Sequence, residues 1–181
     1  YAGAKWVLGG VEPYEGADAD ARAIDTRRGE PGPIAARIDR ALRALFRDET
    51  LKYQVIQYLL ARTQAPALWE EIERAAKLID PLLDQARKIA DRYRVENDIA
   101  YVEARSSLPY DKTELLLLGQ QRAKVAVVRD AGSLSIAADF ESGLDLVKLF
   151  EMGGGMPTRV SVAESRLDEV MQKLAVAVLP R

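Results

Sequence analysis

The 181-residue sequence contains no cysteine and no histidine. Without cysteine there are no disulfides, thiolate nucleophiles, iron–sulfur clusters or cysteine-bound zinc sites. Without histidine there are no Ser-His-Asp or Cys-His catalytic groups and no histidine-ligated zinc or iron. Any catalysis by this chain alone is therefore restricted to carboxylates, lysine, arginine, tyrosine or a hard metal such as magnesium held by carboxylates.

Long apolar runs and an excess of basic charge are also missing. No apolar run approaches the roughly 18 residues that a membrane span needs, and no basic-then-apolar signal segment opens the chain. The formal net charge is −2 and the pI about 5.4, without the strong basic excess of many nucleic-acid-binding domains, although a local basic patch stays possible. We expect a soluble, cytoplasmic protein that does not contact membranes. Because the first residue is Tyr1 rather than Met, we also expect a fragment of a longer protein.

The first regular pattern along the sequence is helical and begins after residue 32. Residues 1–32 hold half of the glycines and are expected to be irregular, or a remnant of a missing upstream domain. Residues 33–95 form a helical linker or bundle segment, because apolar residues recur there at spacings of three and four. The pattern predicts helices over 34–45 and 51–60, and a third that starts at Pro66 and is kinked or restarted at Pro81.

From residue 96 onward the hydrophobic period changes, which predicts an α/β domain over 96–181. The pattern indicates strands at 99–102, 124–128, 134–138 and 160–162, with a hairpin between the second and third. Asp111 and Glu114 form a capping pair for one helix, and Leu167 to Val178 line the last. Another helix is expected to open at Ser142 with Asp145 and to close at Gly153. The fold class is therefore α+β: a helical segment followed by a small mixed sheet covered by helices.

The most unusual motif is the run Gly-Gly-Gly-Met-Pro-Thr-Arg over 153–159. A helix end needs one glycine, so two of the three are left over. Consecutive glycines let backbone N–H groups converge on an anion, and Thr158 and Arg159 add a hydroxyl and a planar guanidinium suited to phosphate. A helix cap with a close backbone crossing would also account for the glycines, and the sequence leaves both interpretations open.

The order of these elements resembles the C-terminal, DHH-associated domain of the DHH phosphoesterase family, which includes RecJ-type exonucleases, oligoribonucleotide phosphatases and exopolyphosphatase-like proteins. The family has a Gly-Gly-Gly-His-Pro motif near the chain end, which matches Gly153, Gly154, Gly155 and Pro157. The resemblance covers about residues 95–178, with residues 33–94 corresponding to the linker helices.

The resemblance implies a substrate-binding module for phosphodiesters or oligonucleotides, with single-stranded nucleic acid as a possible ligand. It implies substrate-binding residues at Gly153, Gly154, Gly155, Thr158 and Arg159, and a further basic contact from Arg105 on the sheet. The family histidine falls on Met156. The family's catalytic domain binds manganese or a similar metal through Asp and His, so the resemblance implies that this chain lacks that domain, holds no metal or catalytic residue, and would be inactive alone.

Three other groups of residues are candidates for a functional role. Glu70 and Glu73 share one side of a helix, where an exposed carboxylate pair is usually only solvated. A basic helix face could follow a nucleic-acid backbone or serve only for solvation, and consists of Arg37, Arg40, Arg43 and Arg47. The segment Arg105-Ser106-Ser107 is expected to face the glycine-rich loop. The alternatives to a phosphoesterase module are a helical interaction or oligomerisation module without ligand chemistry and, third, a small-molecule enzyme using carboxylates.

Overall fold

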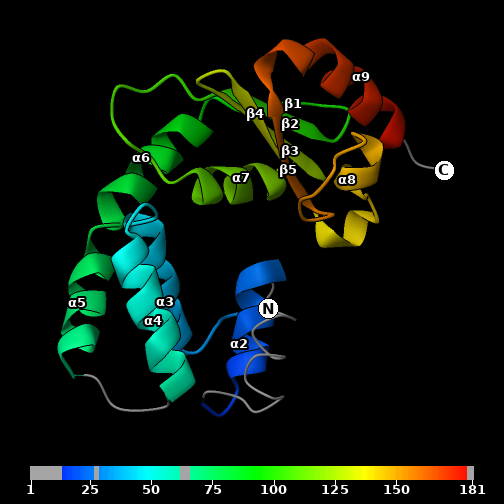
Figure 1. Cartoon of the computed structure of the whole chain (residues 1–181). Coiled ribbons are helices and arrows are strands. Elements are labelled where there is room, and N and C mark those ends of the chain that lie inside the picture. Colours follow the sequence, from blue (N-terminus) through cyan, green and yellow to red (C-terminus); the bar gives the residue numbers. More distant parts are fainter. Residues whose placement is uncertain (1–13, 27–28, 62–65, 179–181) are drawn as a thin grey trace. The chain divides into compact units, whose positions relative to one another are not determined.

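The structure, a computed structural model, describes residues 14–26, 29–61 and 66–178. The chain divides into two compact units, Tyr1–Asp80 and Pro81–Arg181. The described residues of the first unit form helices, and the second combines helices with a five-stranded sheet (Figure 1). This composition confirms the expected α+β class. Within the described ranges, no helix is both long and apolar enough to cross a lipid bilayer.

The described residues of the first unit form the helices α2 (Ala17–Thr26), α3 (Pro33–Ala44), α4 (Glu49–Ala61) and α5 (Pro66–Lys77). The helices expected over 34–45, 51–60 and from Pro66 are confirmed. Buried residues of α3, α4 and α5 form one apolar cluster, consisting of Ile38, Ala41, Leu51, Val55, Ile72, Ala75 and Ala76. Residues 17–26 lie in the segment expected to be irregular or a remnant of an upstream domain, and they form α2. The Gly32 N–H donates to Asp20 Oδ1 at 2.6 Å and ties α2 to the start of α3.

The helix expected to be kinked or restarted at Pro81 is restarted. Helix α5 ends at Lys77, and α6 (Asp80–Ala90) begins with Pro81 in its first turn, where a missing N–H costs nothing. The boundary between the two compact units lies at this restart. Contacts therefore group α6 with the sheet, whereas the hydrophobic pattern of the sequence groups it with the preceding helices.

The sheet of the second unit has the order β1-β2-β3-β4-β5. Its strands are β1 (Arg94–Glu96), β2 (Ile99–Glu103), β3 (Val125–Asp130), β4 (Ser133–Ala138) and β5 (Arg159–Ala163). The last four confirm the expected strands, including the β3–β4 hairpin. Strand β1 was not expected, because all its residues are exposed and show no apolar alternation.

Strands β2 and β3 are the one parallel pair of neighbours in this sheet, and all other neighbours are antiparallel. A parallel pair needs a crossover, which α7 (Lys112–Gln120) supplies. The predicted capping pair of α7 is confirmed, because the Asp111 carboxylate accepts a hydrogen bond from the Glu114 N–H at 2.5 Å.

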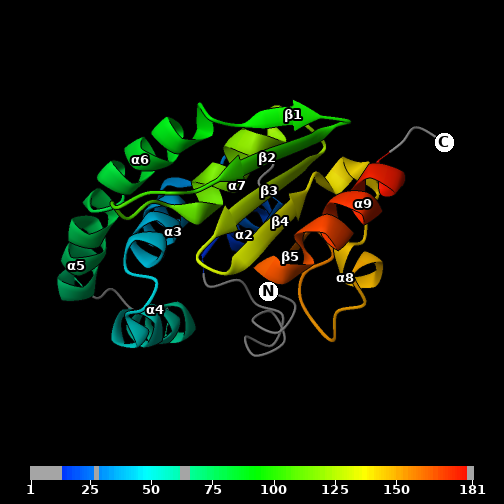
Figure 2. The same cartoon turned by 90° about the horizontal axis from the view of Figure 1, so that it is seen from above.

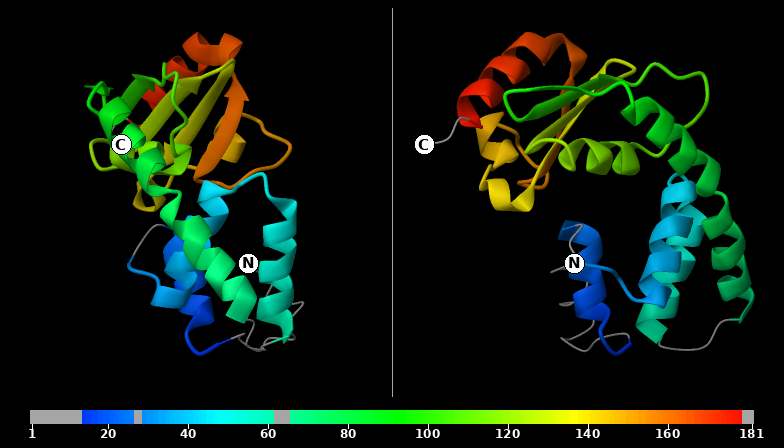
Figure 3. Two further views of the ribbon diagram at one scale, coloured as in Figure 1. Left: turned by 90° about the vertical axis from the view of Figure 1, so that its left-hand side faces the viewer. Right: turned by 180° about the vertical axis from the view of Figure 1, so that it is seen from behind.

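Both faces of the sheet are covered by helices, α6 and α7 on one and α8 (Leu146–Leu149) and α9 (Leu167–Ala177) on the other (Figures 2 and 3). Successive strand residues alternate between these faces: Ala126 and Val128 pack toward α7, and Val125 and Val127 toward α8 and α9. The same alternation continues into the polar ends of the strands, where it positions the charged residues described below.

The helix expected to open at Ser142 and close at Gly153 is wrong at both ends. Ser142 instead ends a 3-10 turn (Phe140–Ser142), and Gly143 follows with a φ of 67°. Helix α8 begins only at Leu146, with Asp145 as its cap accepting from the Lys148 N–H at 3.1 Å. It ends at Leu149, and the left-handed residue after it is Glu151, with a φ of 56°.

Candidate functional site

The glycine-rich loop connects α8 to β5. After the left-handed residue Glu151, the Met152 N–H donates to the Val147 carbonyl at 2.9 Å and closes the helix. Gly153 is therefore not the cap that the sequence suggested, and the loop retains all three glycines. A Cβ added at Gly153 or Gly154 would meet nothing within 4 Å, and neither residue has a left-handed φ. Neither packing nor backbone conformation requires glycine at these two positions.

The backbone donors of this loop are available. None of the described residues accepts a hydrogen bond from the N–H groups of Gly153, Gly154 or Gly155, and all three residues are exposed. Gly155 has a φ of 129°, a conformation that side chains disfavour. Consecutive N–H groups that lack an internal acceptor can converge on an anion.

The far end of the loop is anchored by a tight turn over residues 156–159. The Arg159 N–H donates to the Met156 carbonyl at 2.9 Å, and Pro157 occupies the second turn position, where a fixed φ is favoured. The Pro157 carbonyl accepts from the Leu146 N–H at 2.7 Å, and the Thr158 carbonyl accepts from the Ala138 N–H at 2.9 Å. These bonds tie the loop to the start of α8 and to the end of β4.

Little side-chain charge around the loop is unpaired. Lys148 pairs with Asp145 at 3.1 Å, and Lys124 pairs with Asp98 at 2.8 Å. The hydrogen bond from the Lys148 N–H, followed by the Lys148 side chain, lowers the pKa of Asp145. Attraction of an anion to the loop would therefore depend mainly on the backbone N–H groups. The Arg159 side chain is half-buried at the start of β5.

The predicted site residues fall into two separate places. Residues 153–159 lie together, but Arg105 does not face them, so that expectation is wrong. Arg159 is opposite Ala137, whereas the other end of β5, Ala163, is opposite Ser133. Arg105 lies at this second end, two residues after Glu103, which pairs with Arg129 of β3. Four residue steps along a strand separate the two ends by about 13 Å.

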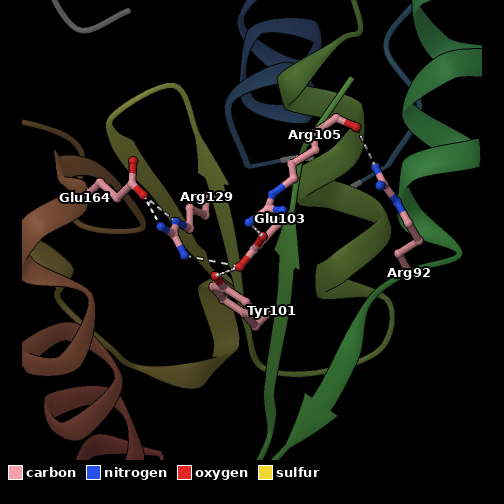
Figure 4. Close-up of polar contacts among 6 residues, drawn as sticks. All are labelled: Arg92, Tyr101, Glu103, Arg105, Arg129 and Glu164. Atoms are coloured by element: carbon pink, nitrogen blue, oxygen red, sulfur yellow. Dashed lines mark hydrogen bonds and ion pairs between the residues drawn. The ribbon is translucent and has the colours of Figure 1, made fainter. Parts of the chain in front are cut away.

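Arg105 belongs instead to a network of charges at the carboxyl ends of β2 and β3 (Figure 4). Arg129 donates to Glu164 at 2.5 Å and to Glu103 at 3.1 Å. The other Glu103 oxygen pairs with Arg105 at 2.7 Å, and the Tyr101 hydroxyl donates to Glu103 at 3.4 Å. The neighbouring Tyr101 and Glu164 raise the pKa of Arg129, which keeps it charged.

Two further arginines complete this network, and sequence reasoning missed both together with Arg129. Arg92 donates to the Arg105 carbonyl at 3.2 Å, and Arg94 lies opposite Tyr101 on the neighbouring strand. A signal was available in the sequence: Tyr101, Glu103 and Arg105 alternate at every second position, which places polar side chains on one side of an extended segment.

Four of the other candidate residues form ion pairs in the first unit: Arg37, Arg40, Arg43 and Glu73. Glu73 pairs with Arg37 at 2.8 Å, Asp80 with Arg40 at 2.5 Å and Asp39 with Arg43 at 3.2 Å. The basic face of α3 is thus largely neutralised. In the part of the chain that the structure describes, no group of three or more acidic residues is arranged to hold a metal ion.

Comparison with known proteins gives a similarity of fold. No family model matches the sequence, and no curated protein matches it. Among solved structures, the chain is similar to the pGpG-specific phosphodiesterase PggH from Vibrio cholerae, with 14% sequence identity and a TM-score of 0.55. The match covers 92% of this chain and 67% of that protein. The chain thus shares its fold with a phosphodiesterase.

Proposed function

We propose that this chain is the substrate-binding module of a DHH-type phosphoesterase that acts on phosphodiesters or short oligonucleotides. The glycine-rich loop, residues 153–159, would be its phosphate site. The shared fold with a pGpG-specific phosphodiesterase supports this proposal, as does the Gly-Gly-Gly-X-Pro run at the expected place before the last strand.

One observation carries the proposal most directly. Gly153 and Gly154 have no conformational or packing reason to be glycine, yet both are glycine and both expose a backbone N–H. A side chain at either position would cover the N–H groups, so the one consequence of glycine here is access to the backbone. Access of this kind is what a phosphate bound by main-chain donors requires.

The proposal assigns binding and not chemistry to this chain. Hydrolysis in the family depends on manganese or magnesium held by Asp and His residues, and a catalytic domain upstream would supply them. Met156 stands where the family motif has histidine, and a thioether cannot donate a hydrogen bond. We therefore expect binding through backbone N–H groups, Thr158 and Arg159, and no phosphodiester hydrolysis by the chain alone.

The test is a titration of the chain with pGpG at low salt, where phosphate contacts are strongest. Gly154→Ala should weaken binding about tenfold while leaving the thermal midpoint unchanged, because its methyl group blocks anion approach to donors worth about 1.5–3 kcal/mol each. Arg159→Gln should weaken it similarly. Arg87→Gln, which removes an exposed arginine paired with Asp84 on α6, is the control for net charge. Equal affinity of the parent and Gly154→Ala would refute the loop as the phosphate site.

A second candidate function, self-association through the helical unit, is favoured by the outer side of α4. Tyr53, Ile56 and Leu60 follow one another at three- and four-residue spacing and are 63%, 52% and 38% exposed. Apolar surface that follows one helix side is typical of an interface. Sedimentation of the chain and of Ile56→Asp would test this, and a monomeric parent chain would exclude it.

A further inference from the structure

The charged network at the carboxyl ends of β2 and β3 surrounds two adjoining hollows. One, of about 290 Å³, is lined by Arg92, Arg94, Tyr101, Val102, Glu103 and Arg105. The other, of about 310 Å³, is lined by Glu103, Ala104, Arg105, Ser106, Arg129, Asp130, Ala131 and Glu164. They share Glu103 and Arg105 as a common wall and together form one groove, which we name the arginine groove.

Positive charge exceeds negative charge at the Arg92 side of the groove. Arg129 is neutralised by Glu103 and Glu164 on its two sides. The Glu103 carboxylate is therefore shared between Arg129 and Arg105. Arg94 forms no ion pair with any described residue, and Arg92 donates to the Arg105 carbonyl rather than to a carboxylate. The Glu103 carboxylate thus pairs with Arg105 and with Arg129, and of the described arginines lining the groove neither Arg92 nor Arg94 forms an ion pair with it.

The bond that holds Arg105 is easily exchanged. Its side chain is 80% exposed, and an ion pair this exposed is screened by water and contributes little to stability. Arg105 can leave Glu103 for another oxyanion without disturbing the core, because Ala104, the residue before it, is fixed by its N–H donating to the Arg129 carbonyl at 2.8 Å. The groove therefore offers a movable guanidinium on an ordered backbone.

We propose that the arginine groove binds a phosphate-bearing ligand of nucleotide size, with Arg105 exchanging Glu103 for the phosphate. Guanidinium groups match phosphate oxygens with paired N–H donors, and Arg92, Arg94 and Arg105 line this hollow from two segments of chain. A hollow of about 300 Å³ suits a small ligand. Tyr101 lines the same hollow and presents an aromatic side chain next to the arginines. This site is distinct from the glycine-rich loop and does not depend on it.

In this proposal Glu103 competes with the phosphate of the ligand for Arg105. It occupies Arg105 when no ligand is present, so the ligand's phosphate must displace it. Removing its charge frees Arg105 and adds positive potential to the groove, while Arg129 keeps Glu164 as a partner. Glu103→Gln should therefore tighten binding, whereas loss of an ordinary structural ion pair would not.

The experiment titrates the full chain with 5′-GMP and, separately, with guanosine at low salt, by calorimetry. We expect saturable binding of 5′-GMP and none of guanosine. Arg105→Gln and Arg94→Gln should each weaken 5′-GMP binding about tenfold, as expected for loss of one charge-assisted contact, and Glu103→Gln should strengthen it. Arg87→Gln, which removes an exposed arginine outside both sites, should leave it unchanged.

Arg94→Gln keeps the test decisive if Arg105 or Glu103 variants unfold, since Arg94 is exposed and has no ion pair to lose among the described residues. Equal binding of guanosine and 5′-GMP would overturn the proposal, as would unchanged 5′-GMP affinity in a folded Arg94→Gln. If Gly154→Ala alone abolished 5′-GMP binding, the nucleotide would belong to the loop and the proposal for the groove would fail.

Discussion

Gly119, in the last turn of α7, is where helix and sheet approach most closely. A Cβ added there would lie 2.6 Å from the Ala126 Cβ and 2.7 Å from both Cζ and Oη of Tyr93. Carbon atoms in contact prefer separations of about 3.5–4.0 Å, so the added methyl group is about 1 Å too close to two neighbours. Gly119→Ala should therefore be strongly destabilising.

Neither neighbour can move away cheaply. The Ala126 Cβ is attached directly to the backbone of β3, which is hydrogen-bonded to β2 and β4. The Tyr93 hydroxyl donates to the Leu115 carbonyl at 2.7 Å in a buried position, and burial raises the pKa of Tyr93. Relief of the clash would require either a shift of α7 away from the sheet or rotation of the tyrosine ring with loss of its hydrogen bond.

The expected magnitude combines three effects. Overpacking costs about 1–3 kcal/mol, and breaking the tyrosine hydrogen bond would cost about 1 kcal/mol. Replacing glycine by alanine within a helix raises the free energy of unfolding by about 1 kcal/mol. We expect a net loss of about 1–3 kcal/mol in the free energy of unfolding, measured by urea denaturation followed by far-ultraviolet circular dichroism.

Gly153→Ala is the matched control. The same change is made where the added methyl group meets nothing within 4 Å and where φ is not left-handed. It should leave the free energy of unfolding unchanged or raise it by up to about 1 kcal/mol, through a more restricted unfolded chain. If Gly119→Ala proved no more destabilising than Gly153→Ala, the close packing of α7 on β3 would be refuted.

Two more predictions concern charge and capping. Hydrogen bonds from Arg166 and then Lys173 lower the pKa of Glu169 from 4.5 to about 2, so its contribution to stability is present above pH 4.5 and is lost as the pH falls toward 2. In Glu169→Gln, acid titration of stability should be flatter over that range, and a curve identical to the parent's would contradict this. Asp111→Ala should cost about 1 kcal/mol because the Glu114 N–H loses its acceptor, whereas Asp111→Asn should retain most of the stability in thermal denaturation.

Strong local patterns in this sequence predicted the elements well. Strands β3 and β4 could be predicted because apolar residues lie together there between turn residues. The start of α7 could be predicted because the Asp111 carboxylate stands three residues before Glu114. Strand β1 lacked such a signal, because it is an exposed edge strand that carries Arg94 and Glu96. An edge strand held mainly by backbone bonds leaves little trace in the side-chain pattern.

The region before the glycine-rich loop was misjudged for a reason of backbone conformation. Gly153 was expected to take the left-handed position after α8, since glycine does so at little cost. Glu151 takes it instead, and Asn97, Asp98 and Ala131 also have positive φ. A residue with a side chain enters this conformation when the surrounding structure determines its path, which sequence alone does not reveal.

The placement of the two candidate sites depends on strand direction. Strands β2 and β3 are parallel, so the residues after β2 and the last residues of β3 meet at one edge of the sheet, which brings Arg105 beside Arg129. Strand β4 reverses direction and β5 reverses it again, so β5 starts at the opposite edge and the loop before it lies there too. A mononucleotide held at one edge cannot reach the other across about 13 Å of strand. Arg105→Gln therefore perturbs the groove alone, and Gly154→Ala perturbs the loop alone.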